Sequence, residues 1–86
     1  MDVVNKVIEF FFSKGLSQKY TQDEILNYNY FESGLIDSMG TIEMVEQFEQ
    51  LFNIKFSMDD MLSDDFLVVG DLINLINKLL QDSKHN

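Results

Sequence analysis

Ser38 is the residue of this 86-residue chain whose setting could support covalent chemistry. It follows Asp37 where a long irregular segment meets the start of a predicted helix. The first backbone N–H groups of a helix have no acceptor inside it, and together with the helix dipole they stabilise a phosphate group on an exposed hydroxyl. The site is therefore suited to phosphate attachment. Asp and Ser are also ordinary helix caps, however, and capping alone would explain an isolated Asp-Ser pair.

Side chains for other kinds of catalysis are scarce. The chain has no cysteine, which excludes a disulfide framework, a zinc–thiolate site and a cysteine nucleophile. Ser38 and Gly40 match half of the hydrolase motif Gly-x-Ser-x-Gly, but Ile36 stands where the first glycine is needed. The single histidine, His85, lies in a tail that we expect to be frayed, so no base serves the serine. We predict no catalytic residue, and any thiol must come from an attached group.

Acidic residues dominate the charge of the chain. Fifteen aspartates and glutamates face six lysines, for a formal net charge of −9, and between Thr21 and Asp71 the only basic residue is Lys55. Such a surface repels nucleic acid and anionic lipid and attracts proteins with basic patches. An acidic face that only maintains solubility is an equally open interpretation. The aspartates of residues 59–65 lack the spacing of a calcium-binding loop, and we predict no metal site.

The spacing of apolar residues predicts an all-α bundle of three main helices and one short helix. We expect the main helices over residues 2–14, 38–53 and 70–80, the short helix over 58–63 with Ser57 as its cap, and a frayed tail over 81–86. No apolar run is long enough to span a bilayer, and the N-terminus lacks the features of a signal peptide. We therefore expect a cytoplasmic protein without direct membrane insertion. The faces predicted to be buried comprise Val4, Val7, Ile8, Phe11 and Phe12 in the first helix, Ile42, Met44, Val45, Phe48, Leu51 and Phe52 in the second, and Leu72, Ile73, Ile76, Leu79 and Leu80 in the last.

The long loop between the first two main helices, residues 16–37, has no sustained periodicity. It contains Thr21-Gln22-Asp23-Glu24, a capping-box pattern that predicts one short helical turn. A loop of this length in a small domain is more often functional than idle. We expect its apolar side chains to pin it onto the core; these are Tyr28, Tyr30, Phe31, Leu35 and Ile36.

The stretch Phe-Glu-Ser-Gly-Leu-Ile-Asp-Ser-Met-Gly-Thr-Ile-Glu, residues 31–43, resembles the attachment motif of the acyl and peptidyl carrier protein family. In that family the motif is Asp-Ser-Leu or a near variant, followed by an acidic amphipathic helix; here it reads Asp37-Ser38-Met39. The resemblance covers residues 3–80. Within the family the stretch is most similar to D-alanyl carrier proteins and related freestanding aminoacyl carriers, chiefly because of the Gly40-Thr41 pair.

The resemblance implies a four-helix carrier-protein bundle, with a single carrier domain over residues 1–80. It implies covalent 4′-phosphopantetheine on Ser38, added by a phosphopantetheinyl transferase, with a cargo held as a thioester on the thiol of this cofactor. An adenylating ligase or acyltransferase would load the cargo, and downstream synthase, condensing or transferase enzymes would receive it. D-alanyl or other aminoacyl, polyketide and fatty-acid types all remain open, and no catalytic activity of its own is expected.

The resemblance also implies which residues meet partner enzymes. Asp37 is the acidic neighbour that a transferase would read, Met39 and Ile42 lie on the helix that partners grip, and Glu43 and Glu46 would meet basic residues. We expect a monomer that binds no nucleic acid. The alternative hypothesis is a carrier-like acidic adaptor domain that is never modified and acts only through protein–protein interaction.

Overall fold

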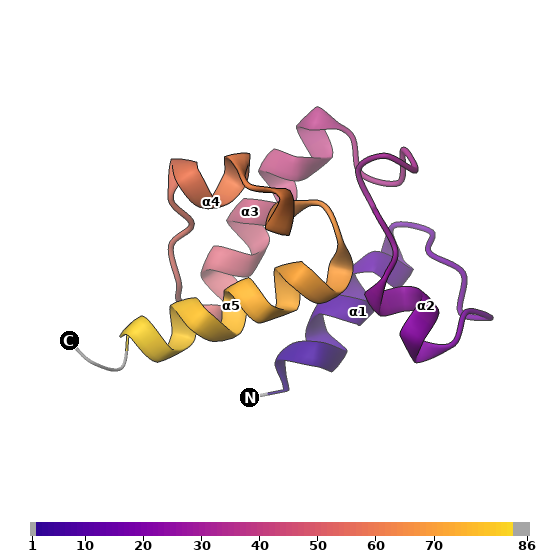
Figure 1. Cartoon of the computed structure of the whole chain (residues 1–86), viewed down its shortest axis with the longest axis horizontal. Helices are drawn as coiled ribbons and strands as arrows, with labels where there is room; N and C mark the ends of the chain where they lie inside the picture. The colour runs from indigo at the N-terminus through magenta and orange to yellow at the C-terminus, as the bar shows by residue number, and fades with distance from the viewer. Residues whose placement is uncertain (1, 84–86) are drawn as a thin grey trace.

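The structure is a computed structural model that describes residues 2–83 (Figure 1). Its elements in chain order are α1 (Val3–Ser13), α2 (Gln22–Leu26), α3 (Ser38–Phe52), α4 (Met58–Leu62), the 3₁₀ turn η1 (Asp64–Phe66) and α5 (Val69–Ser83). Residues 2–83 contain no strand longer than the isolated bridge between Asn29 and Val68. The all-α prediction is confirmed, with three long helices and the short α4 as expected. The chain also forms α2 from the predicted capping box.

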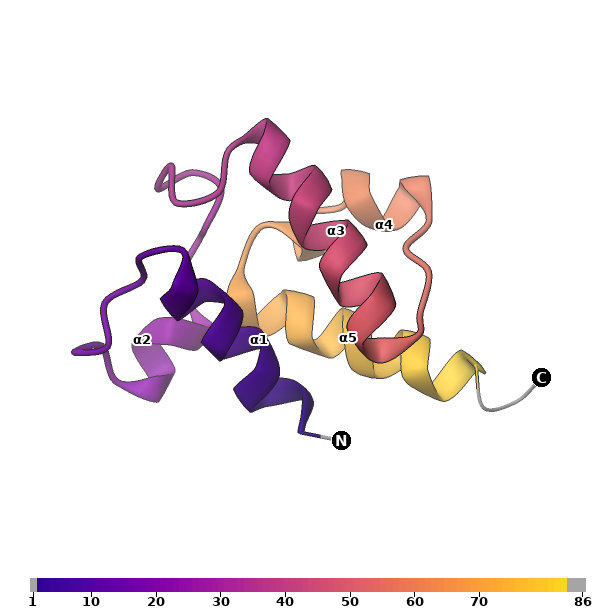
Figure 2. The same cartoon turned by 180° about the vertical axis from the view of Figure 1, so that it is seen from behind.

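Helix α1 packs against α5 and contacts α3 through Phe10 and Phe48; Figure 2 shows it beside these two helices. Its first residues are capped by Asp2, whose carboxylate accepts from the Asn5 N–H at 3.2 Å, and it ends just before Gly15, whose φ of +113° suits glycine. Phe10 is buried against Phe48, with ring centroids 4.9 Å apart, whereas Phe12 is only partly buried. The prediction placed Phe12 rather than Phe10 on the buried face. Packing on two sides widens the buried arc of a helix beyond a single stripe.

Helix α2 packs closely on the start of α5. Its capping box is complete, because Thr21 accepts from the Glu24 N–H at 3.2 Å and Glu24 accepts from the Thr21 N–H at 2.9 Å. A Cβ built on Gly70 of α5 would lie 2.7 Å from the carbonyl oxygen of Leu26. Glycine at this position therefore permits the close approach of the two backbones.

The segment after α2 is joined to the turn before α5 by backbone hydrogen bonds. The Tyr30 N–H donates to Leu67 O at 3.0 Å, and the Val69 N–H donates to Tyr28 O at 3.1 Å. The Tyr30 hydroxyl also donates to the Phe66 carbonyl, and its burial, with a smaller contribution from Asp71, raises the pKa of Tyr30. This bridge connects residues far apart in the sequence and anchors the chain that leads to α3.

The expectation that the loop is pinned by apolar side chains holds for most of them. Tyr30 and Ile36 are buried, and Tyr28 and Leu35 pack against the core. Phe31 is the exception, because it is 43% exposed. Its N–H donates to the side chain of Asn29, so the chain turns directly after Tyr30 and directs Phe31 outward.

The C-terminal elements largely follow the prediction. Ser57 caps α4 in a reciprocal capping box with Asp60, with contacts of 3.0 Å and 2.9 Å. The last helix starts one residue earlier than expected and continues to Ser83 instead of ending at Leu80. The predicted helix end at residue 80 is therefore three residues too early. The frayed tail predicted over residues 81–86 stays a prediction, and residues 84–86 lie outside those that the structure describes. Leu72, Ile73 and Ile76 are buried as predicted, and Leu79 and Leu80 are partly buried.

Candidate functional site

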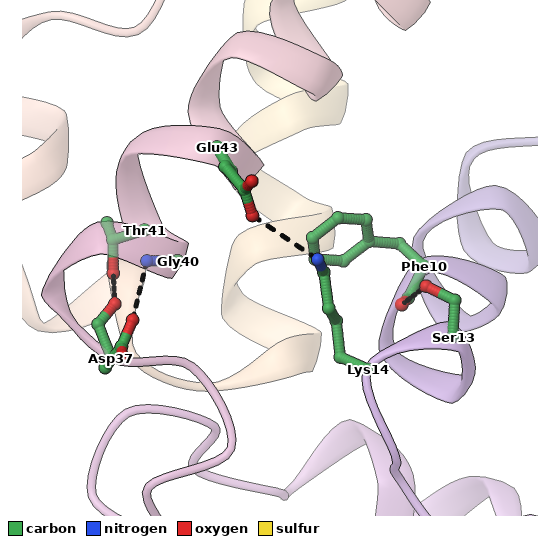
Figure 3. A network of polar contacts seen from close by, with 7 residues as sticks. All are labelled: Phe10, Ser13, Lys14, Asp37, Gly40, Thr41 and Glu43. Atoms are coloured by element: carbon green, nitrogen blue, oxygen red, sulfur yellow. Dashed lines mark hydrogen bonds and ion pairs between the residues drawn. The ribbon is translucent and has the colours of Figure 1, made fainter.

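Ser38 is the first residue of α3 and is exposed to solvent. Asp37 precedes it as the N-cap: the Gly40 N–H donates to Asp37 Oδ1 at 2.7 Å, and the Thr41 hydroxyl donates to Asp37 O at 3.0 Å (Figure 3). These contacts determine how the loop enters the helix. The capping role considered from the sequence is thus real, and it belongs to Asp37, which leaves the Ser38 hydroxyl available at the surface.

The loop that leads to Ser38 is anchored to the core through Ile36 and Tyr30. Ile36 is 2% exposed, and its N–H donates to Tyr30 O at 2.9 Å. Gly34 turns the chain with a φ of +83°, a conformation that glycine adopts without strain. Because Tyr30 is itself tied to the turn before α5, the position of Ser38 is linked to the core through buried side chains and backbone hydrogen bonds.

The start of α3 also offers backbone N–H groups that can donate hydrogen bonds to an anion. At this end of a helix the N–H groups of Ser38 and Met39 have no acceptor within the helix, while the next one, that of Gly40, is satisfied by Asp37. The fifteen-residue α3 adds the positive end of its dipole. A phosphate ester on the Ser38 hydroxyl fits this setting. Within residues 2–83 no three acidic or histidine side chains gather in a way that could hold a metal ion.

Two apolar side chains on the first turns of α3 are exposed to solvent. Met39 is 78% exposed and Ile42 is 61% exposed, although the apolar spacing placed Ile42 in the buried stripe of the helix. The stripe actually centres on Met44, Phe48 and Phe52, which belong to the core, where Phe48 packs against Phe10 of α1. The assignment of Ile42 to the core is therefore wrong, and its contact with partner enzymes stays a prediction.

Helix α4 contributes two further exposed apolar residues that the sequence analysis did not single out. Met58 and Leu62 are 68% and 77% exposed, and they lie one helical turn apart. Helix α4 lies beside α3 in both views of the molecule (Figures 1 and 2). The spacing of Met58 and Leu62 was a readable signal, but in a five-residue helix it does not distinguish a buried face from an exposed one.

Glu43 has a partner inside the chain. The Lys14 ammonium lies 3.4 Å from Glu43 Oε2 and 5.5 Å from the centre of the Phe10 ring (Figure 3). This ion pair links the end of α1 to α3 across 29 positions of sequence. Glu46 is exposed on the next turn of α3. The Glu43 side chain is also 69% exposed, so its carboxylate is accessible from outside although Lys14 contacts Oε2.

The fold and the site define a small helical domain that displays a serine at the start of its second long helix. A comparison with protein families matches residues 19–76 to the family described as "Phosphopantetheine attachment site". Because the match covers more than half of the chain, the chain belongs to this family, whose members carry 4′-phosphopantetheine covalently. The prediction from the sequence motif is confirmed at this level.

Individual relatives give a similar picture. The chain is 28% identical over 81 residues to the D-alanyl carrier proteins of Streptococcus pyogenes serotype M5 (strain Manfredo), serotype M49 (strain NZ131) and serotype M1. The alignments cover 92% of this chain and 96% of each relative. No solved structure matches the chain significantly. None of the helices within residues 2–83 has the length and apolar character needed to cross a membrane.

Proposed function

We propose that Ser38 is the attachment residue, and that this chain carries an acyl or aminoacyl group as a thioester on 4′-phosphopantetheine bound there. One observation carries the proposal: the hydroxyl is exposed at the first position of α3, within the matched residues 19–76, beside N–H groups that have no acceptor in the helix. The cofactor, when bound, supplies the thiol that the chain lacks. The domain itself performs no catalytic step.

Attachment requires a phosphopantetheinyl transferase and coenzyme A. The Ser38 oxygen forms a bond to the phosphorus next to pantetheine and loses its proton, while the phosphoanhydride bond breaks and adenosine 3′,5′-diphosphate leaves. Asp37 fixes the entry of the loop into α3 and thereby directs the hydroxyl outward. Its carboxylate is also exposed, so a transferase can read its charge.

Among the possible cargoes, D-alanyl or another aminoacyl group is favoured over fatty acyl and polyketide groups. The support is the alignment with D-alanyl carrier proteins along nearly the whole length of both chains. An adenylating ligase would load the cargo, or an acyltransferase would load an acyl group. Downstream synthase, condensing or transferase enzymes would receive it. The protein would act in the cytoplasm as a monomer.

The partner surface lies around the start of α3. Met39 and Ile42 are the exposed apolar contacts, and Asp37 and Glu46 are exposed acids beside them. Charged groups at the rim of an interface chiefly speed encounter, while apolar contacts at its centre supply affinity. Glu43 would join this surface, because its carboxylate is accessible beside Lys14.

Intact-mass measurement tests the attachment. The chain is incubated with coenzyme A, magnesium and a broad-specificity transferase, beside Ser38→Ala and a control, Ser33→Ala, which removes a nearby exposed serine. The expected result is a gain of one phosphopantetheine in the parent chain and in the control, and none in Ser38→Ala. No gain with several transferases would instead favour the unmodified adaptor. A panel of adenylating ligases, read by the same mass measurement, would then identify the cargo.

A further inference from the structure

The methionine side chains of this chain differ sharply in their exposure to solvent. They contain all of its sulfur, because the sequence has five methionines and no cysteine. Four of the five lie within the residues that the structure describes. Met39 and Met58 are exposed. Met44 is fully buried, and Met61 packs in part against the core. Solvent therefore reaches two of these four thioethers readily.

Met39 combines this exposure with a place beside the attachment residue. It follows Ser38 directly as the second residue of α3. It also lines a hollow of about 310 Å³ at the start of α3, together with Asp37 and Gly40. An enzyme that brings a phosphopantetheine donor to the Ser38 oxygen must therefore also meet the Met39 side chain. Met58 is exposed to a similar degree, but it begins the separate helix α4.

A hydroperoxide oxidises an accessible methionine by transfer of one oxygen atom. The thioether sulfur attacks the terminal peroxide oxygen and the O–O bond breaks. The attacked oxygen stays on sulfur, and its proton passes to the departing oxygen, which leaves as water or an alcohol. Sulfur is thus oxidised by two electrons to the sulfoxide, and the peroxide is reduced. A methionine sulfoxide reductase reverses the change: a dithiol supplies two electrons and becomes a disulfide, and the oxygen leaves as water.

We propose that Met39 is a site of reversible oxidation, at which a hydroperoxide turns an apolar contact of the partner surface into a polar one and slows the modification of Ser38. The inference rests on the proposed function, because it needs an enzyme that docks at the start of α3. Ile42 is the other exposed apolar residue of this surface and carries no sulfur. Oxidation therefore changes one of the two apolar contacts and leaves the other as it is.

Oxidation of Met39 alters the surface without disturbing the fold. A sulfoxide on this exposed side chain is hydrated by solvent, and no core packing is lost. The cap of α3 also stays in place, because it joins the Asp37 carboxylate to the Gly40 N–H. A sulfoxide on Met44 would instead disrupt the core, but burial shields that sulfur from the oxidant. The pattern of burial thus separates a change in recognition from damage to the fold.

Mild treatment of the apo chain with hydrogen peroxide, removed afterwards by catalase, tests the proposal. The chain has neither cysteine nor tryptophan, so methionine is its most readily oxidised residue. Peptide mass mapping is expected to show one added oxygen at Met39 and at Met58, and none at Met44. The initial rate of phosphopantetheine transfer should then fall about five- to thirtyfold, with an unchanged circular dichroism spectrum. A methionine sulfoxide reductase with a dithiol should restore the rate.

Two leucine variants assign the effect to one sulfur. Leucine is apolar and close to methionine in volume, but it cannot form a sulfoxide. For each variant the measured quantity is the ratio of its own transfer rates before and after peroxide. In Met39→Leu this ratio should stay near one. In the matched control Met58→Leu it should change as in the parent chain.

The possible outcomes separate the oxidation site from the attachment. If Met39 gains oxygen and the rate does not fall, or if Met39→Leu loses as much rate as the parent, the oxidation switch is refuted and the attachment stands. Oxidation of Met44 ahead of Met39, or loss of the helical spectrum, would likewise refute the switch. If the untreated chain gains no phosphopantetheine, both proposals are refuted.

Discussion

Asp37 combines two roles that substitution can separate: it caps α3, and it presents an exposed charge next to Ser38. Asp37→Ala removes the acceptor of the Gly40 N–H, a contact of 2.7 Å, and should lower the free energy of unfolding by about 1 kcal/mol. In a domain of this size such a loss lowers the melting temperature by about 4–8 °C. Asp37→Asn keeps an acceptor oxygen and loses only the charge at the helix start, which is worth about 0.3–1 kcal/mol.

The assay pairs urea unfolding with the initial rate of phosphopantetheine transfer. If the transferase reads the carboxylate, both variants slow transfer to a similar degree, although Asp37→Asn is the more stable of the two. Glu32→Gln, which removes another exposed charge from the same loop, serves as the control and should transfer normally. Normal transfer in Asp37→Asn would refute recognition of the charge, and unchanged stability in Asp37→Ala would refute the cap.

Three further substitutions test the support of the site and its surface. Tyr30→Phe leaves the Phe66 carbonyl without its hydroxyl donor and should lower the free energy of unfolding by about 1–3 kcal/mol in urea titrations. Because burial raises the pKa of Tyr30, the unfolded chain loses the phenolic proton at a lower pH than the folded chain. The stability of the parent should therefore fall above about pH 10. Tyr30→Phe should not show this loss of stability at high pH. Gly70→Ala presses a Cβ against Leu26 O, so thermal unfolding should show a loss of about 1–3 kcal/mol, not the gain usual for alanine in a helix. Glu46→Lys should slow loading by a partner ligase without changing the circular dichroism spectrum; equal loading at low salt would exclude this residue from the encounter surface.

Features that depend on neighbours in the sequence were predictable. The caps formed by Thr21, Asp37 and Ser57 each involve a residue three positions further along, so the local pattern determines them. The three long helices follow from apolar spacing for the same reason. The position of Ser38 at a helix start, on which the functional hypothesis depends, is a local feature of this kind.

Features that depend on distant residues were not predictable. The ion pair of Lys14 with Glu43 and the bridge between Asn29 and Val68 join segments that only the tertiary fold brings together. The exposure of Ile42 likewise depends on which side of α3 the other helices cover. Periodicity shows that a helix has an apolar side, but it does not show how wide the covered side is. Residues of the site that face a partner are therefore harder to assign than the attachment residue.

None of the five side chains of α4 is fully buried, and Met61 packs against the core only in part. The segments on either side of α4 are anchored instead by Phe56 before it and Phe66 after it. These two residues are buried and pack edge to face with ring centroids 5.5 Å apart. Opening α4 would therefore break a capping box, a few helical hydrogen bonds and the partial contact of Met61 with the core, while the fully buried core residues keep their packing. The amides of α4 should exchange with solvent through local opening, at a free energy well below that of global unfolding. The face formed by Met58 and Leu62 can thus change shape without the domain approaching the unfolded state.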